Sequence, residues 1–179
     1  YHVAKLTSQF KGSKLVDTSK EKSGIIFGSD VDAVSAYDES TGTLRVMAYN
    51  YKNSLKYDKD VELTFNISAP QFEGKKVKVT QYVIDDNCNY FDEWVEDRIA
   101  YGITDDKFCW SPDDPSIDNP TTLKDEKARE TYFNELYPKY TRCSQLIPTE
   151  SEATVTNDTL TLNTTLAPHG VVVYEITEV

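Results

Sequence analysis

VDAVSAY, residues 31–37, and TLRVMAYN, residues 43–50, decide the fold expected for this chain. In both segments apolar and polar residues alternate, which places one kind of side chain on each face of a β-strand. The residues between them, 38–42, are of types that favour a turn. The two segments therefore predict an antiparallel β-hairpin.

The same alternation continues along both halves of the chain. Further segments with a period of two lie at 61–67, 77–84, 153–156, 159–166 and 171–176. The last three are separated by turn residues, at Asn157-Asp158 and at Pro168-His169-Gly170. Seven or eight strands with no helix between consecutive ones predict an all-β fold, an antiparallel β-sandwich.

One long section interrupts the strands, from about residue 87 to about residue 148. Its first part is rich in Asp, Pro and aromatic residues, and its second part, 123–140, carries apolar residues at helical spacing, with Pro138 near its end. We therefore expect a β-sandwich domain at 24–179 with one inserted loop-plus-helix excursion. An insertion of this length usually binds or covers something.

The first stretch is expected to be a connector. Residues 1–23 begin with a pattern typical of the end of a helix, and Gly12 then turns the chain toward the first strand. The chain begins with Tyr1 rather than Met, as expected of a processed protein or of a piece of a longer one. We expect residues 1–23 to lead from a preceding domain into the sandwich.

Composition favours one folded domain and excludes several partners. The chain has 179 residues, 39% hydrophobic and 12% aromatic, which is enough to bury a core. Its 19 basic and 30 acidic residues give a net charge of −11, so nucleic acid and anionic membranes are poor partners. No apolar stretch reaches the length of a membrane helix. No glycine-rich phosphate loop occurs, and no cofactor is expected.

The cysteines indicate neither a disulfide framework nor a zinc site. Cys88, Cys109 and Cys143 are too few and too scattered for either. A disulfide between Cys109 and Cys143, which flank the helical segment, stays open. Three free thiols are the favoured alternative.

Three Asn-x-Ser/Thr sequons begin at Asn66, Asn157 and Asn163. They lie in strand-like runs, where chance matches are common. They therefore say little about the compartment of the protein.

Acidic residues are dense at the start of the insertion but form no identifiable catalytic pair. Glycosidases hold two carboxylates about 5–10 Å apart. The acidic run at 85–97 is expected to be a solvated surface, and the doublets at 105–106 and 113–114 lack the spacing of a calcium loop. Neither histidine is placed for nucleophilic catalysis, and His169 is expected to be a turn residue. We therefore expect no catalytic residue and no metal site.

Aromatic residues are the remaining candidates for ligand contact, because the C–H faces of sugar rings stack on flat side chains. One irregular segment holds six of them: Tyr90, Phe91, Trp94, Tyr101, Phe108 and Trp110. The amides Asn87 and Asn89 are close in sequence. For Trp94 and Trp110, a small satellite core under the insertion is the favoured alternative.

The stretch YVIDDNCNYFDEW, residues 82–94, resembles a strand-then-loop signature in the β-sandwich domain of glycoside hydrolase family 39, the β-xylosidase and α-L-iduronidase family. Segments 32–37 and 42–50 resemble the family's hairpin whose second strand ends in Tyr-Asn, and 160–166 and 171–176 resemble its closing strands. Two features depart from the family. Cys88-Asn89 stands where Ser-Asn is common, and 101–146 is longer than expected.

The resemblance implies a non-catalytic chain. In family 39 the general acid and the nucleophile, both Glu, lie on a TIM barrel that precedes the sandwich, and this sequence does not contain that barrel. We therefore expect the C-terminal accessory β-sandwich of such an enzyme, with the catalytic barrel as its partner. Alternatives are a free-standing carbohydrate-binding module and a sandwich-type surface or adhesion domain.

Four residues of the matching segment receive expected roles. Asn89 and Tyr90 are expected to be exposed at the rim of the substrate cleft, where they contact oligosaccharide only together with the barrel. Asp85 is expected to organise the loop by accepting backbone hydrogen bonds. Trp94 is expected to anchor the return of the loop on the edge of the sandwich.

Overall fold

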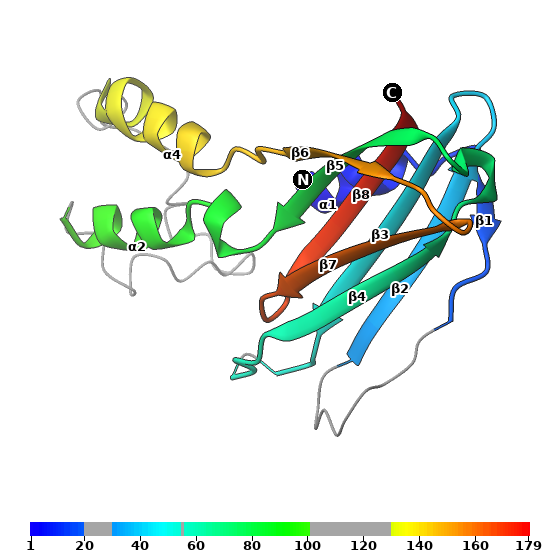
Figure 1. Ribbon diagram of the computed structural model, residues 1–179. Helices are drawn as coiled ribbons and strands as arrows, with labels where there is room; N and C mark the ends of the chain where they lie inside the picture. The colour runs from blue at the N-terminus through cyan, green and yellow to red at the C-terminus, as the bar shows by residue number, and fades with distance from the viewer. Residues whose placement is uncertain (20–29, 55, 101–129) are drawn as a thin grey trace. The chain divides into compact units, whose positions relative to one another are not determined.

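The computed structural model describes residues 1–19, 30–54, 56–100 and 130–179, which belong to two units (Figure 1). The first unit comprises Tyr1–Asp86 and Leu146–Val179, and the second comprises Asn87–Gln145. Each unit is a compact body with its own internal contacts.

Antiparallel strands build the first unit. One sheet has six strands in the order β1-β2-β3-β8-β5-β6, and a second sheet consists of β4 and β7 (Figure 1). The strands are β1 (Lys14–Val16), β2 (Asp30–Asp38), β3 (Thr43–Tyr51), β4 (Val61–Ser68), β5 (Lys76–Ile84), β6 (Thr149–Thr154), β7 (Thr159–Leu166) and β8 (Val171–Glu178). A 3₁₀ turn, η1 (Pro70–Phe72), precedes β5. The all-β antiparallel sandwich predicted from the sequence is confirmed.

The hairpin predicted from residues 31–37 and 43–50 is confirmed. β2 and β3 pair along their whole lengths, from Asp30 opposite Tyr51 to Asp38 opposite Thr43. In the turn, Gly42 has a φ of +65°, a left-handed conformation that glycine adopts at little cost. The Asp38 carboxylate accepts a hydrogen bond from the backbone N–H of Ser40 at 2.9 Å, which fixes the other side of the turn.

Strand β6 differs from its prediction. It runs from Thr149 to Thr154, whereas the alternation predicted a strand at 153–156. Its sequence, TESEAT, is almost entirely polar and exposed, because β6 is an edge strand that pairs with β5 on one side. Backbone hydrogen bonds define this strand, and a search for apolar residues cannot detect it.

The core of the sandwich lies between the two sheets. Alternate residues of the central strands β3, β5 and β8 face inward and are buried, and the inward side chains of β4 and β7 meet them. Phe65 of β4 and Tyr174 of β8 contact each other edge to face, with ring centroids 5.4 Å apart. The buried residues are Leu44, Val46, Ala48, Ile67, Ala69, Phe72, Val77, Val79, Val155, Leu160, Leu166, Val172, Tyr174 and Ile176.

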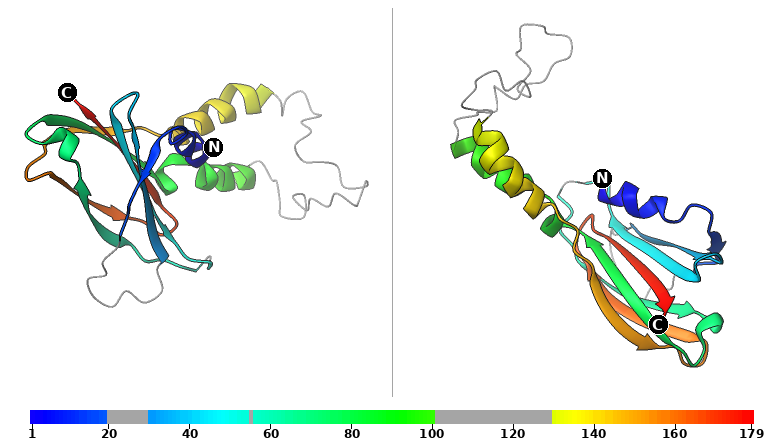
Figure 2. Two further views of the ribbon diagram at one scale, coloured as in Figure 1. Left: turned by 90° about the vertical axis from the view of Figure 1, so that its right-hand side faces the viewer. Right: turned by 90° about the horizontal axis from the view of Figure 1, so that it is seen from above.

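The first stretch of the chain belongs to the sandwich unit. Helix α1 (His2–Ser8) lies along the outer face of the six-stranded sheet, on the side away from β4 and β7 (Figure 2). Its Leu6 is 2% exposed, and Ala36 and Val173, which face outward in the register, are also buried. The stretch thus contains a short helix, as its opening pattern indicated. That residues 1–23 lead from a preceding domain stays a prediction.

The second unit is helical where the structure describes it. It begins within the 3₁₀ turn η2 (Asp86–Cys88) and contains α2 (Phe91–Ala100), the π-helical segment η4 (Tyr132–Leu136) and α4 (Tyr137–Cys143). The predicted irregular loop at the start of the insertion is wrong, because α2 begins at Phe91. The helix predicted roughly between residues 123 and 140 is present at 130–140 and continues to Cys143. The predicted start at residue 123 lies outside the described residues.

Local chemistry explains both corrections. The Asn89 side-chain oxygen accepts a hydrogen bond from the backbone N–H of Phe91 at 2.7 Å, and two acidic residues in the first turn of α2 favour a helix N-terminus. Residues 130–143 form one continuous helical stretch, in which Pro138 comes directly after the π-helical segment η4, so Pro138 does not end the helix. Within the described ranges no helix is long and apolar enough to span a membrane.

Candidate functional site

Asn89 and Tyr90, the expected substrate contacts, lie in the second unit, immediately before α2. Asn89 is half-buried, and its carboxamide oxygen is the one that accepts from the N–H of Phe91. Tyr90 is 47% exposed and stacks on Tyr140 of α4, with ring centroids 5.2 Å apart and the planes inclined by 26°. Asn89 therefore has a capping role, and one face of the Tyr90 ring is already used. Contact of either residue with a substrate stays a prediction.

Asp85 and Trp94, the expected structural residues, lie in different units. Asp85 follows β5 in the sandwich unit and is half-buried. Trp94 lies on α2 in the second unit, also half-buried, with its ring centroid 6.0 Å from that of Phe91. Trp94 is therefore a helix residue and not the return of a loop. Its packing on the sandwich and the hydrogen bonds expected of Asp85 stay predictions, and Tyr101, Phe108 and Trp110 lie outside the described residues.

An ion pair joins the two helical segments of the second unit. Lys139 of α4 donates to both carboxylate oxygens of Asp97 of α2, each at 2.9 Å. The hydrogen bond from Lys139 lowers the pKa of Asp97, and a hydrogen bond from Tyr140 adds to this against the opposing effect of burial. The same bond to Asp97 raises the pKa of Lys139. Both groups are thus held in their charged forms, as befits a structural pair.

Nucleophilic chemistry is not favoured at Cys143. Burial, followed by the hydrogen bond to Glu93, raises the pKa of the Cys143 thiol. A thiol with a raised pKa supplies little thiolate, which is the nucleophilic form. Cys88 and Cys143 are not bonded to each other, and the alternative pairing of Cys143 with Cys109 involves a residue outside the described part of the chain.

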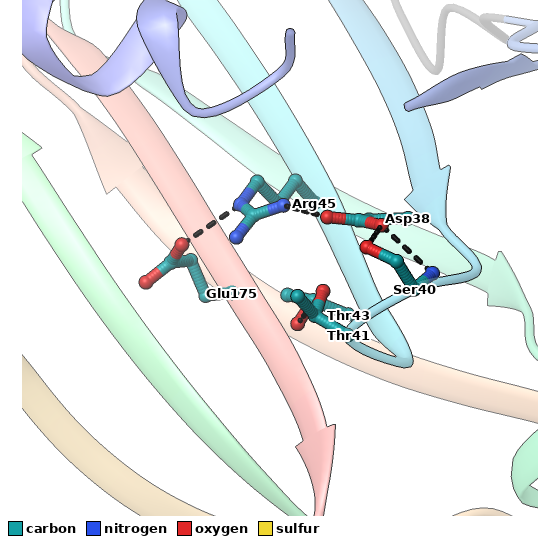
Figure 3. A network of polar contacts seen from close by, with 6 residues as sticks. All are labelled: Asp38, Ser40, Thr41, Thr43, Arg45 and Glu175. Carbon is teal, nitrogen blue, oxygen red and sulfur yellow. Dashed lines mark hydrogen bonds and ion pairs between the residues drawn. The ribbon is translucent and has the colours of Figure 1, made fainter. Parts of the chain in front are cut away.

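A polar network covers part of the outer face of the six-stranded sheet (Figure 3). The guanidinium of Arg45 lies between two carboxylates, with Nε 2.8 Å from Glu175 and Nη1 3.9 Å from Asp38. Hydrogen bonds from Ser40 and Thr41 lower the pKa of Asp38. Arg45 is thus fixed between β2 and β8, on which these two acids lie.

Beside this network lies a surface hollow of about 330 Å³. Its two carboxylates are both ion-paired, Glu175 with Arg45 and Glu150 with Lys78 at 2.6 Å. Burial, followed by the charge of Glu175, raises the pKa of Tyr82. A glycosidase needs one carboxyl group that holds a proton and a second that is free to act as a nucleophile or as a general base. Two paired carboxylates serve neither purpose. The ion pairs join neighbouring strands of the sheet, and the hollow is a poor catalytic site.

The end of the sandwich opposite the β2–β3 turn holds a cluster that the sequence did not predict. Asn50 is fully buried and donates through Nδ2 to the backbone carbonyls of Lys59, Leu166 and Ala167 at 2.9–3.1 Å. The Tyr57 hydroxyl donates to the Asn50 side-chain oxygen at 2.9 Å. Asn50 therefore joins the β3–β4 connection to the end of β7. The sequence did not predict the burial of Asn50, because an Asn near the end of an alternating strand is usually exposed.

His169 completes this cluster and lies in the β7–β8 turn, as predicted. Its φ is +58°, its Nε2 is 3.2 Å from the backbone oxygen of Ser54, and the rings of Tyr51 and Tyr57 contact it edge to face. No acid or nucleophile accompanies it in these contacts, so the arrangement orders the two loops. Across the described ranges, no group of three or more His, Cys, Asp or Glu residues is arranged to hold a metal ion.

Comparison with known structures indicates the family of folds. The chain is similar to the GH39 enzyme from Xanthomonas axonopodis pv. citri, with a TM-score of 0.50 and 9% sequence identity, covering 82% of this chain and 26% of that one. It is also similar to a monomeric beta-xylosidase from Caulobacter crescentus CB15, with a TM-score of 0.47 and 13% identity, covering 81% and 26%. No family model and no curated protein matches the sequence.

The likeness concerns the fold alone, because the identity is so low. The chain has a GH39-like fold and spans about a quarter of the length of these enzymes. The resemblance predicted from residues 82–94 is supported at this level.

Proposed function

We propose that this chain is a non-catalytic accessory β-sandwich domain of a glycoside hydrolase, which packs against a TIM-barrel catalytic domain and supports it. The observation that carries the proposal is the structural match, in which 82% of this chain corresponds to only 26% of a GH39 enzyme. A fold that makes up a quarter of a glycosidase is more simply an accessory part than the site of reaction. Its pairing with a barrel rests on the family resemblance of residues 82–94.

Three of the described carboxylates are paired in a way that suits a non-catalytic role. Those that line the hollow on the six-stranded sheet are ion-paired, and so is Asp97 in the second unit. Such pairing keeps a carboxylate charged and occupied, which suits neither a general acid nor a nucleophile. Hydrolysis in the parent enzyme is therefore assigned to another part of that enzyme.

The outer face of the six-stranded sheet is the better docking surface for a barrel. Leu15 of β1 and Tyr49 and Tyr51 of β3 face outward there, with 76%, 37% and 49% of their surfaces exposed. Helix α1, on the same face, adds Val3 and the preceding Tyr1, which are 43% and 93% exposed. Several large apolar side chains exposed on the same face are a feature of surfaces that a partner covers. The outer face of β4 and β7 carries only small polar residues and Glu62.

The test compares this chain with the full product of its gene. We expect the full product to hydrolyse an aryl β-xyloside or another aryl glycoside and the chain alone to hydrolyse none. Hydrogen exchange should be slower for α1 and β1 in the full product than in the isolated chain, because docking covers them. Turnover by the chain alone, or a gene product that contains no second folded domain, would overturn the proposal.

A matched pair of variants sharpens this test. Leu15→Glu places a charge on the proposed docking face, and Thr161→Glu places one on the exposed face of β7. Both positions are exposed, so neither change should destabilise the isolated chain by more than about 0.5 kcal/mol. In the full product, Leu15→Glu is expected to lower the melting temperature and Thr161→Glu is not. Equal effects of the two variants would argue against docking through this face.

The rival function, a carbohydrate-binding module, has one observation in its favour. Tyr49 and Tyr51 are two positions apart on β3, so their exposed rings lie on the same face. Calorimetric titration of the isolated chain with xylo-oligosaccharides distinguishes the two functions. Binding that is lost in Tyr49→Ala and Tyr51→Ala would favour the module, and no binding is expected for a docking surface.

A further inference from the structure

The outer face of the small sheet has an unusual composition for this acidic protein. The register pairs four residues of β4 with four of β7, and all eight side chains face outward and are exposed. They are Glu62, Thr64, Asn66 and Ser68 on β4 and Thr165, Asn163, Thr161 and Thr159 on β7. Seven of these eight residues are neutral hydroxyl or amide residues, and the eight include no aromatic ring and no cation.

Two of the three sequons lie in the middle of this face. Asn66-Ile67-Ser68 is on β4 and Asn163-Thr164-Thr165 is on β7. Because a strand has a period of two, the first and third residues of a sequon share a face. In both sequons that face is the exposed one. The strand placement that made these motifs uninformative in the sequence thus presents them to solvent in the structure.

The hydrogen bonds of the two asparagines leave their amide nitrogens available. Thr64 Oγ1 donates to Asn163 Oδ1 at 2.8 Å, and Thr161 Oγ1 donates to Asn66 Oδ1 at 3.2 Å. An N-linked sugar replaces one hydrogen on Nδ2 and keeps the carboxamide oxygen as an acceptor. Attachment of a sugar at either residue therefore breaks neither hydrogen bond. Asn50 is the opposite case, since its Nδ2 donates to three carbonyls in the interior.

We propose that Asn66 and Asn163 carry N-linked glycans, which makes the β4–β7 face a solvent-facing surface of the protein. In the modification, Nδ2 attacks C1 of an oligosaccharide held on a lipid diphosphate. The C1–N bond forms, the C1–O bond to the diphosphate breaks, and the lipid diphosphate leaves with the electron pair. The amide proton passes to a base of the transferring enzyme. This inference does not rest on the proposed function.

Glycans at these positions have a consequence for assembly. N-linked glycans are bulky and hydrophilic, and they occupy surface that a protein partner cannot then cover. Both are attached to the same small sheet, whereas the exposed apolar side chains of the six-stranded sheet lie on the other side of the core. A glycosylated β4–β7 face leaves the six-stranded sheet as the face open to a partner.

The deciding experiment is glycopeptide mapping of the protein isolated from its natural source. A glycan-removing amidase converts each glycosylated Asn into Asp, and tandem mass spectrometry then identifies the position. We expect Asn→Asp conversion at residues 66 and 163. Unmodified peptides at both positions would overturn the proposal, whatever the outcome of the docking experiments.

Variants secreted from a eukaryotic host test the geometry. Thr165→Ala should remove the glycan at Asn163, while Thr165→Ser should retain it, and Ser68→Ala and Ser68→Thr form the matching pair for Asn66. All four changes are at exposed positions, so the chain should fold in each case. The glycosylated chain should unfold at a temperature no lower than the enzymatically deglycosylated chain. A lower unfolding temperature would show that the folded face does not accommodate the sugars.

Discussion

The sandwich unit and the helical unit are stabilised in different ways. In the sandwich, fourteen buried side chains from two sheets share one core, and the register of each strand repeats the burial at every second residue. Among the described residues of the helical unit, only Cys88 and Tyr140 are buried. That unit depends on a few specific contacts, the Tyr90–Tyr140 stack and the Asp97–Lys139 pair. Core substitutions should therefore affect the sandwich most.

The largest effect is expected from Leu166→Ala at the end of β7. Leu166 is 0% exposed and belongs to the core, so truncation should lower the free energy of unfolding by about 2–5 kcal/mol. Thr165→Ala, one position earlier and facing solvent, is the matched control and should change it by less than about 0.5 kcal/mol. Urea unfolding of the unglycosylated chain measures both. Equal effects would mean that the two sheets do not share a packed core.

A smaller loss is expected from Asn50→Ala. The change removes the donor of three hydrogen bonds to backbone carbonyls and should cost about 1–3 kcal/mol, because buried carbonyls are left without a partner. Asn53→Ala, at an exposed position of the same connection, is the control. Urea unfolding should separate the two variants clearly. An unchanged midpoint for Asn50→Ala would show that water replaces the lost donor.

These two positions show what the sequence can and cannot predict about the sandwich. Leu166 follows a run of alternating residues, and simple periodicity assigns it to the core. Asn50 ends an equally regular strand, yet its burial depends on Lys59, Leu166 and Ala167, which approach it from elsewhere in the chain. The bounds of strand β6 could not be predicted for a related reason, since its pairing with β5 uses backbone groups that nearly every residue has.

In the helical unit, the sequence singled out candidate residues but did not predict helix α2. Phe91, Trp94 and Val95 have helical spacing, but the dense acids and amides around them favoured a loop. The side chain of Asn89 decides the matter locally by accepting from the N–H of Phe91. The stack of Tyr90 on Tyr140 joins residues fifty positions apart, so no local pattern predicts it. A role for Asn89 as an exposed substrate contact is thereby less favoured than one for Tyr90.

Acid is expected to weaken the helical unit by breaking the Asp97–Lys139 pair. The pKa of Asp97 is lower in the folded chain than its ordinary value of 3.8, so the unfolded chain takes up this proton first. The stability that Asp97 contributes is fully present above about pH 4 and is lost as the pH falls through the lowered folded-state pKa.

Circular dichroism at the helix band, followed during acid titration, measures this effect. Asp97→Asn should reduce the helix signal at pH 7 and remove part of its dependence on pH below about 4, and Lys139→Met should do the same from the other side of the pair. Glu135→Gln on η4, at an exposed position with no ion pair to another described residue, should retain the dependence of the parent chain. A titration of Asp97→Asn that matches the parent would exclude this pair as the source of acid sensitivity.

The smallest effect on stability, and the one most informative about function, is expected from Tyr90→Ala. Nearly half of the Tyr90 side chain is exposed, so loss of its stack on Tyr140 should cost less than about 1 kcal/mol. Trp94→Ala, at a half-buried position of α2, should reduce the helix signal more and serves as the structural comparison.

If Tyr90 contacts oligosaccharide at a cleft rim, Tyr90→Ala in the full gene product should raise KM at unchanged kcat, because such a contact binds substrate and transition state alike. Asn89→Ala is a poorer probe, since it also removes the hydrogen bond to the first turn of α2, worth about 1 kcal/mol. A KM that changes with Trp94→Ala and not with Tyr90→Ala would place the functional contact on the body of the helix, and unchanged kinetics in both would remove the helical unit from the substrate cleft.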